Sequence, residues 1–159
     1  MDLQMVYAYE PIIAELDRYI AKTALHHDPV AHALLNTIPG VGTILSLVIL
    51  YEIENIKRFP RVQDFVSYCR LVKCAKESNG KKTGKGNKKI GNPNLKWAIC
   101  EATIILLRES EQAKKLHQKL IKKNGEGKAL GILSNKLGRA IYYMLKNKKA
   151  FDMNKFFSH

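Results

Sequence analysis

The stretch LNTIPGVGTILSLVI, residues 35–49, decides the fold that this sequence predicts. It matches the helix-hairpin-helix pattern, with Ile38, Val41 and Ser46 at its apolar and small positions. The glycines permit a sharp turn, and the first N–H groups of the next helix then point outward, where they can bind a phosphate. Gly40, Gly42 and Thr43 are therefore candidate nucleic-acid-binding residues. The alternative is a tight interhelical turn that serves packing alone.

Helices are predicted on both sides of this turn, and the fold class is all-α. The apolar spacing predicts helices over residues 31–37, 43–53, 62–71, 95–107, 111–123 and 129–148. Asn92 is a good N-cap with Pro93 at the first helical position, and Gly125 ends a helix. A leading amphipathic helix covers residues 1–28, interrupted or restarted near Pro11. It either packs on the domain or forms a coiled-coil arm with a second copy, so a homo-oligomer is expected.

The domain division follows from these helices. Residues 1–28 form the N-terminal helix, residues 29–152 the helix-hairpin-helix domain, and residues 153–159 a C-terminal tail. No strand pattern and no internal repeat stand out.

The charge of the chain points to an anionic partner. A formal net charge of +13 and an isoelectric point near 9.7 favour nucleic acid. An anionic membrane surface or an acidic protein is the alternative. The longest apolar run, residues 44–51, is far too short to span a membrane, and no signal peptide is recognised. A cytoplasmic protein without membrane association is expected.

Cysteine and histidine usage predicts no metal site. Cys69, Cys74 and Cys100 are odd in number and lack paired spacing, which indicates reduced thiols that mostly fill the core. The histidines His26, His27 and His32 have no matching thiolates or carboxylates.

Residues 77–97, ESNGKKTGKGNKKIGNPNLKW, are predicted to begin with a basic, glycine-rich loop that holds Ser78. The lysines around this serine are Lys76, Lys81, Lys82, Lys85, Lys88 and Lys89. Their ammonium groups suit phosphate, and contact with nucleic acid would be salt-sensitive. A solvated insertion without a specific role is the alternative. A serine hydroxyl needs help to attack phosphorus, and no evident base is present, so the residues alone favour a simple turn residue at Ser78.

The ordered combination of these motifs resembles the C-terminal domain of the DEDD-type insertion-sequence transposases, the bridge-RNA-guided recombinases of bacteria and archaea. The resemblance covers residues 30–152: the IPGVG turn, the segment RFPRVQDF, the serine-containing loop, and the closing stretch GEGKALGILSNKLGRAIYYMLKNKKAFD. The loop closes on the family's Lys-x-Gly-Asn/Asp-x-x-Leu-Arg/Lys pattern, here at Lys89, Gly91, Asn92, Leu95 and Lys96.

This resemblance implies that Ser78 attacks DNA and forms a phosphoserine link. It also implies that Asn92 and Lys96 belong to the nucleic-acid-binding set. The sequence departs from the family pattern at three positions. Asn79 follows the serine where glycine is usual, Lys88 replaces a frequent serine, and Lys96 replaces the usual arginine.

The family further implies an N-terminal RuvC-like domain that binds Mg²⁺, and a guide RNA. No such domain is recognised here, so no cofactor is expected in this chain, and residues 1–28 correspond to the end of a connecting coiled coil. Two other functions stay open: a non-catalytic helix-hairpin-helix DNA-binding module, and a structural helical dimer. Trp97 is expected to pack in the core, as is at least one of Tyr142 and Tyr143.

Overall fold

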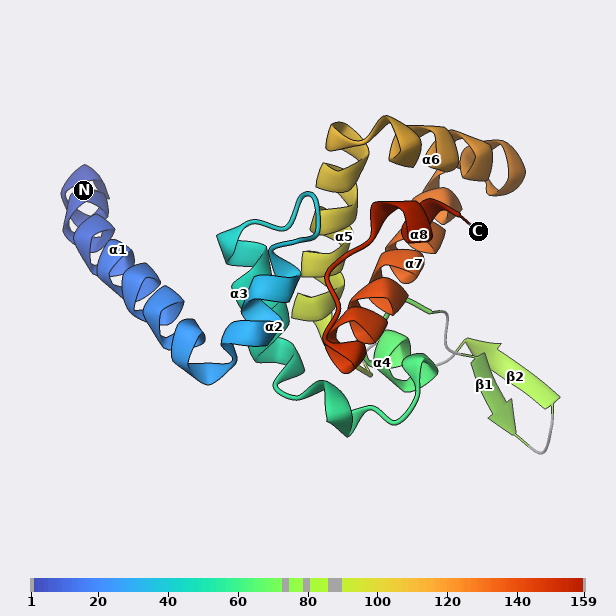
Figure 1. Ribbon diagram of the computed structural model, residues 1–159, viewed down its shortest axis with the longest axis horizontal. Helices are drawn as coiled ribbons and strands as arrows, with labels where there is room; N and C mark the ends of the chain where they lie inside the picture. The colour runs from blue at the N-terminus through green and yellow to red at the C-terminus, as the bar shows by residue number, and fades with distance from the viewer. Residues whose placement is uncertain (1, 73–74, 79–80, 86–89, 159) are drawn as a thin grey trace.

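The helices of the computed structural model form one body from which two elements project (Figure 1). The structure describes residues 2–72, 75–78, 81–85 and 90–158, with the side chains of residues 2, 25, 75–78 and 81–85 outside that description. In chain order the elements are α1 (Asp2–His27), α2 (Pro29–Leu35), α3 (Thr43–Ile53), the 3-10 helix η1 (Ile56–Arg58), α4 (Val62–Tyr68), β1 (Ala75–Ser78), β2 (Lys81–Lys85), α5 (Pro93–Glu109), α6 (Glu111–Asn124), α7 (Glu126–Asn147) and α8 (Met153–Phe157). The predicted all-α class is confirmed.

The core forms around α5, which lies between α3 and α7. Its buried side chains recur at helical spacing, at Leu95, Ala98, Ile99, Ala102 and Leu106. The side chains of α3 that meet them are also apolar and buried, among them Ile49 and Ile53. Burial of this shared apolar surface is the main force that holds the helices together.

Short-range signals set several helix ends where the sequence predicts them, whereas α2 and α7 begin two and three residues earlier than predicted. The Asn92 side chain accepts hydrogen bonds from the N–H groups of Asn94 and Leu95 at the start of α5, and Pro93 takes the first helical position. Gly125, with φ +83°, ends α6 as expected. By contrast α4 ends at Tyr68, three residues earlier than predicted, because the chain turns through Arg70 with φ +54°.

The predicted interruption of the first helix at Pro11 is wrong. α1 runs unbroken from Asp2 to His27 with Pro11 inside it. Proline removes one intrahelical hydrogen bond, but both Tyr7 and Pro11 are exposed, so water can satisfy the carbonyl left without a partner.

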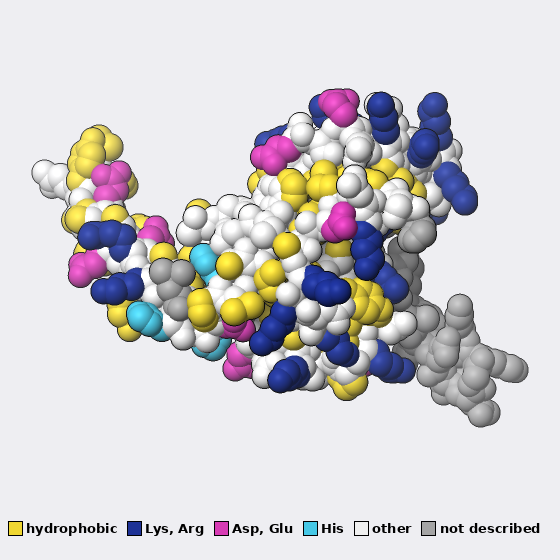
Figure 2. Space-filling view, viewed as in Figure 1, with side chains coloured by type: hydrophobic (Ala, Val, Ile, Leu, Met, Phe, Trp, Pro, Cys, Tyr) yellow, Lys and Arg dark blue, Asp and Glu magenta, His cyan; other side chains and the backbone are white. Residues whose placement is uncertain are grey.

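α1 projects from the body and meets it only through its C-terminal part, which contacts α2 and α3 (Figure 1). Figure 2 shows hydrophobic side chains along the projecting part. Exposed apolar residues at three- and four-residue spacing are Val6, Tyr9, Ile13, Leu16 and Ile20. This pattern suits a coiled coil, and pairing of α1 with a second copy stays a prediction. No helix in the described part of the chain is long and apolar enough to cross a membrane.

Two segments have more structure than the sequence predicts. β1 and β2 form an antiparallel hairpin within the segment expected as a loop, and in Figure 1 it extends from the body beside α4. The C-terminal tail contains α8, whose Phe156 is buried in the core. The chain just before α8 also contacts the helix-hairpin-helix turn, because the Phe151 N–H donates to Thr37 Oγ1 at 3.0 Å.

Candidate nucleic-acid interface

The turn between α2 and α3 brings a glycine against the core and presents a second glycine to solvent. Gly40 has φ +86°, and a Cβ atom there would lie 2.9 Å from both Ile105 Cβ and Leu106 N of α5. Gly42 is exposed, and a Cβ atom there would meet nothing within 4 Å. The apolar pattern residues Ile38 and Val41 are buried. The first glycine therefore fixes the turn on α5, while the second leaves the start of α3 open to a partner.

The N-terminus of α3 is uncapped and exposed, as the predicted phosphate contact requires. Gly42 is its N-cap and supplies no side-chain cap to the first turn. Thr43 and Ile44 are exposed, and Ile44 is 72% exposed although it is apolar. N–H groups at an open helix start carry a partial positive charge that favours an anion. These features agree with the helix-hairpin-helix interpretation, in which backbone groups contact a DNA strand without reading its sequence.

The basic hairpin carries Ser78 at the end of β1. Ser78 pairs with Lys81 and Glu77 pairs with Lys82, with an irregularity between Lys76 and Glu77. The structure places Lys76 in β1 and Lys81, Lys82 and Lys85 in β2. Lys88 and Lys89 lie outside the described residues. The prediction that the serine and the lysines face one DNA strand stays a prediction.

Both ends of this hairpin segment meet at one place on the helical body, which we call the clasp and define as Tyr68, Arg70, Gly91 and Asn92. The Arg70 Nε donates to the carbonyl oxygens of Ile90 and Gly91, each at 3.1 Å. The Asn92 N–H donates to the Tyr68 carbonyl oxygen at 2.7 Å. These hydrogen bonds join the chain segment that follows α4 to the segment that precedes α5.

Gly91 is the residue of the clasp that tolerates no side chain. Its φ is +97°, and a Cβ atom would stand 2.5 Å from the Tyr68 carbonyl oxygen. Both the backbone conformation and the close approach require glycine. This explains physically why the glycine and asparagine of the Lys-x-Gly-Asn pattern are adjacent: the first makes the approach and the second caps α5.

Glu52, near the end of α3, joins the clasp to the helix-hairpin-helix turn. Its carboxylate accepts hydrogen bonds from Asn92 Nδ2 and Asn94 Nδ2, each at 2.6 Å. Since α3 rises about 1.5 Å per residue, the carboxylate lies on the order of 14 Å along the helix from Thr43. One rigid helix therefore presents the open turn at one end and fixes the base of the serine hairpin at the other.

The pKa of Glu52 is lowered, first by the hydrogen bond from Asn92 and then by that from Asn94, against a smaller opposing effect of burial. A carboxylate whose pKa is lower in the folded chain stabilises the fold above its unfolded pKa, and loses that contribution as the pH falls through its folded pKa. We expect Glu52→Gln to lower the free energy of unfolding by roughly 1 kcal/mol at neutral pH. Urea unfolding followed across the acid range should then show a shallower pH dependence for the variant. Parallel curves for the two proteins would mean that the carboxylate does not stabilise the clasp.

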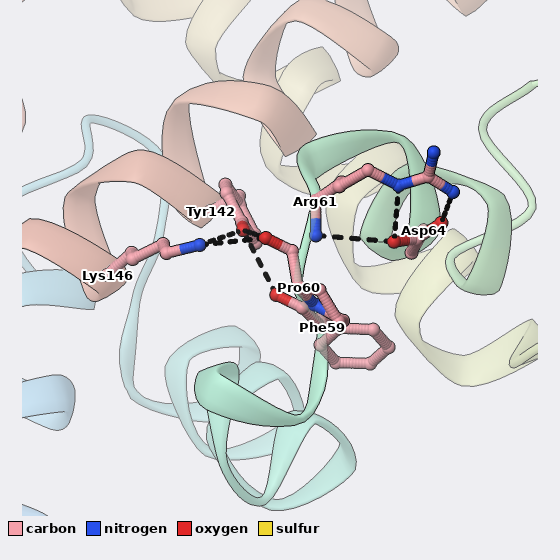
Figure 3. A network of polar contacts seen from close by, with 6 residues as sticks. All are labelled: Phe59, Pro60, Arg61, Asp64, Tyr142 and Lys146. Carbon is pink, nitrogen blue, oxygen red and sulfur yellow. Dashed lines mark hydrogen bonds and ion pairs between the residues drawn. The ribbon is translucent and has the colours of Figure 1, made fainter.

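A second polar network attaches α7 to the segment that follows η1 (Figure 3). The Tyr142 hydroxyl lies 3.0 Å from the carbonyl oxygens of Phe59 and Pro60. Lys146 Nζ donates to the Tyr142 hydroxyl at 2.6 Å and to the Pro60 carbonyl oxygen at 2.9 Å. Tyr142 is buried, as predicted for at least one tyrosine of this pair. The contacts show that the family-like RF segment and closing helix pack together.

Arg61 and Asp64 cap the N-terminus of α4 beside this network (Figure 3). The Arg61 N–H donates to Asp64 Oδ2 at 3.2 Å, and the Arg61 guanidinium binds both oxygens of the same carboxylate. This local pair fixes the first turn of α4, the helix that leads into the clasp.

The expectation for Trp97 is wrong. Trp97 is 50% exposed, because it lies in an open hollow beside Leu47 and Val48 of α3 and not among the side chains that bury Leu95 and Ala98. Lys96 is exposed, in keeping with its predicted role. Asn92 is 8% exposed, and its side chain caps α5 and binds Glu52. We therefore assign Asn92 a structural role in the clasp, and its predicted contact with nucleic acid stays a prediction.

Sequence reasoning also missed Glu52 and Arg70, the two charged residues that hold the clasp. Glu52 could have been noticed as the single acid among the apolar residues of residues 43–53. Arg70 had no comparable signal, since its role depends on a backbone turn and on a contact with residues about 20 positions away.

Cys69 is the cysteine that fills the core as predicted, while Cys100 is half-buried and His26 and His27 are exposed. Cys69 is buried, and burial raises its pKa to about 12, so its thiol is inert near neutral pH. Among the described residues, no three His, Cys, Asp or Glu side chains gather in a way that could hold a metal ion. Cys74 lies outside the described residues.

Comparison with known proteins gives a consistent family. Residues 32–118, more than half of the chain, match the family model described as transposase IS116/IS110/IS902 family. The chain is also 30% identical, over 99 residues, to a protein named as the transposase for insertion sequence element IS1328 of Yersinia enterocolitica. That match covers 62% of this chain and 29% of the longer protein. The matched region contains the helix-hairpin-helix turn, the serine hairpin and the clasp, and the chain belongs to the IS116/IS110/IS902 transposase family.

Proposed function

We propose that this chain is the part of an insertion-sequence transposase that grips DNA through phosphate contacts and presents Ser78 for strand transfer. The observation that carries the proposal is the connection through α3. This helix begins at the open helix-hairpin-helix turn, and its Glu52 is bonded to Asn92 in the clasp of the Ser78 hairpin. A DNA strand bound at the turn would therefore lie at a fixed distance and orientation from the foot of the hairpin.

The proposed contacts divide into two groups. The backbone N–H groups that follow Gly42 bind one phosphate at the start of α3. The six lysines around Ser78 bind neighbouring phosphates as the hairpin approaches the strand. Figure 2 shows that Lys and Arg side chains also outnumber acidic ones on the face of the body that it displays, which agrees with a polyanionic partner.

The proposed chemistry is a transfer of the phosphoryl group to serine. The Ser78 Oγ attacks a DNA phosphorus and forms an O–P bond, while the bond from that phosphorus to a sugar oxygen breaks. The hydroxyl proton passes to a base, and the released sugar oxygen takes up a proton. Lysine ammonium groups nearby stabilise the charge on the transferring phosphoryl group. A DNA hydroxyl then attacks the same phosphorus and gives up its proton to a base. A new sugar O–P bond forms, the Ser78 Oγ–P bond breaks, and the serine oxygen takes back a proton, which completes strand transfer.

Relatives by resemblance use Mg²⁺ and a guide RNA. The resemblance places that Mg²⁺ in the RuvC-like domain of the full-length enzyme, and in the part of this chain that the structure describes no set of acidic, histidine or cysteine side chains fits a metal. The competing proposal is a DNA-binding module whose serine does no chemistry. It predicts the same DNA binding and no covalent link.

Duplex binding is expected to be strongly salt-dependent, and fluorescence anisotropy with labelled duplex DNA measures it. Because about six phosphates are neutralised by the hairpin lysines, the slope of log K against log[salt] should be about −5. Replacing Lys81 and Lys82 with Gln should make the slope shallower by about 2.

The matched control is the same change at Lys122 and Lys123, exposed residues in the last turn of α6, away from the hairpin (Figure 1). That double variant should keep the slope of the wild type. An affinity that does not change with salt, or an equal effect of the two double variants, would refute the placement of DNA on the hairpin.

A further inference from the structure

A hollow beside Trp97 lies next to the proposed DNA-binding elements and has no part in the phosphate contacts. We call it the Trp97 hollow; it is open to solvent, has a volume of about 320 Å³ and is lined by Ile20, Leu47, Val48, Tyr51, Glu52, Asn94 and Trp97. These residues come from α1, α3 and α5. The volume is at the lower end of the range for small-ligand sites.

The lining of the hollow is aromatic and aliphatic with one polar edge. Trp97 and Tyr51 are 50% and 38% exposed, so their ring surfaces are accessible. The polar groups are the Glu52 carboxylate and the Asn94 carboxamide, joined by a 2.6 Å hydrogen bond. Tyr51 is itself positioned, because its hydroxyl donates to the Ile20 carbonyl oxygen at 3.4 Å and its ring stacks on His27.

This combination suits a nucleobase better than a phosphate or a cation. A carboxylate repels phosphate, whereas it accepts hydrogen bonds from the amino and imino groups of a base. An exposed indole offers a surface on which any base can stack. Lys96 is exposed immediately before Trp97 and can bind the phosphate attached to such a base.

The position of the hollow connects it with the serine hairpin. The same Glu52 carboxylate binds Asn94 at the hollow and Asn92 in the clasp. A nucleobase stacked on Trp97 would therefore lie beside the Glu52 carboxylate, which also binds Asn92 at the foot of the Ser78 hairpin. Strand transfer exposes unpaired nucleotides, and a stacked base would hold such a strand in place.

We propose that the Trp97 hollow binds one unpaired base of a DNA strand, stacked on the Trp97 indole, with its flanking phosphate on Lys96. This proposal rests on the proposed function in DNA strand transfer. It means that the chain binds single-stranded DNA as well as duplex DNA. The net charge of +13 and the adjacent Lys96 favour this occupant over an apolar segment of protein.

Trp97 is the single tryptophan of the chain, so its own fluorescence reports on the hollow. The intact chain is titrated with a short single-stranded DNA and with a duplex of equal length, and binding is followed in parallel by anisotropy of a dye on the DNA. We expect the single strand to quench Trp97 emission at saturation and the duplex to quench it much less. Trp97→Ala should weaken single-strand binding by roughly 5- to 100-fold, and Trp97→Phe by less than about threefold.

The matched control is Tyr143→Ala, which removes an aromatic ring of similar exposure (47%) from α7. It should leave single-strand affinity unchanged, and far-ultraviolet circular dichroism shows that each variant is folded. Duplex binding should be the same in Trp97→Ala as in the wild type, which separates failure of this inference from failure of the proposed function.

Four outcomes would overturn the inference. The first is single-strand binding without quenching of Trp97, and the second is equal quenching by single strand and duplex. The third is equal or tighter binding of a single-stranded RNA of the same sequence, which would assign the hollow to RNA. The fourth is a concentration-dependent change of Trp97 emission in the absence of DNA, together with self-association in sedimentation that Trp97→Ala abolishes. That result would assign the hollow to a second copy of the chain.

Discussion

Replacement of Ser78 with alanine is expected to abolish strand transfer while duplex affinity stays within about twofold of the wild type. Removing a nucleophile takes away the atom that forms the covalent bond, and losses on the order of 10³-fold or more follow from such changes. Because the chain matches 29% of the IS1328 transposase, the assay is done with a chimera in which it replaces the matching segment of that longer protein, and with the chain alone. Transfer is measured as joined DNA product per unit time.

The control for this change is Thr83→Ala in β2, which removes a hydroxyl group from the opposite strand of the same hairpin. It should leave strand transfer within a few-fold of the unmodified chimera. Retained transfer in the Ser78→Ala chimera would remove Ser78 from the mechanism and favour the non-catalytic module. Equal loss in both variants would assign the hydroxyls a role in the hairpin structure instead.

Gly40→Ala and Gly42→Ala are expected to impair different properties, stability and DNA affinity respectively, although both residues belong to one turn. At Gly40 the positive φ and the 2.9 Å approach of Ile105 and Leu106 should lower the free energy of unfolding by about 2–4 kcal/mol. At Gly42, where a Cβ atom meets nothing, the loss should stay below about 1 kcal/mol. A methyl group there stands at the open start of α3, so duplex affinity should fall by about 3- to 10-fold.

Urea unfolding and anisotropy, made on the same two variants, separate these effects. We expect a large change in unfolding for Gly40→Ala, and a change in DNA affinity with little change in stability for Gly42→Ala. If Gly42→Ala bound duplex as tightly as the wild type, the turn would serve packing alone, which is the alternative that the sequence left open.

The elements that the sequence predicted well are those that depend on residues close together in the sequence. The Pro-Gly-Val-Gly turn, the start of α5 at Asn92 and Pro93, and the end of α6 at Gly125 each depend on backbone conformation within a few positions. The helices between them follow from apolar spacing, since one buried stripe is sufficient to identify a helix.

The features that sequence missed depend on distant contacts or on weak patterns. β1 and β2 are rich in lysine and glycine and lack the alternation of apolar and polar residues that marks a strand. The exposure of Trp97 depends on how α3 and α5 cross, and the bond from Glu52 to Asn92 joins residues 40 positions apart. Neither can be inferred from local spacing.

The most direct measurement is to identify the residue that becomes linked to DNA. The transposase chimera is incubated with a DNA substrate that cannot complete transfer, then denatured, digested and analysed by mass spectrometry for nucleotide-bearing peptides. A phosphodiester adduct on Ser78, absent from the alanine variant, is the predicted result. An adduct on any other side chain, or product formed with no covalent protein–DNA species at all, would contradict the assignment.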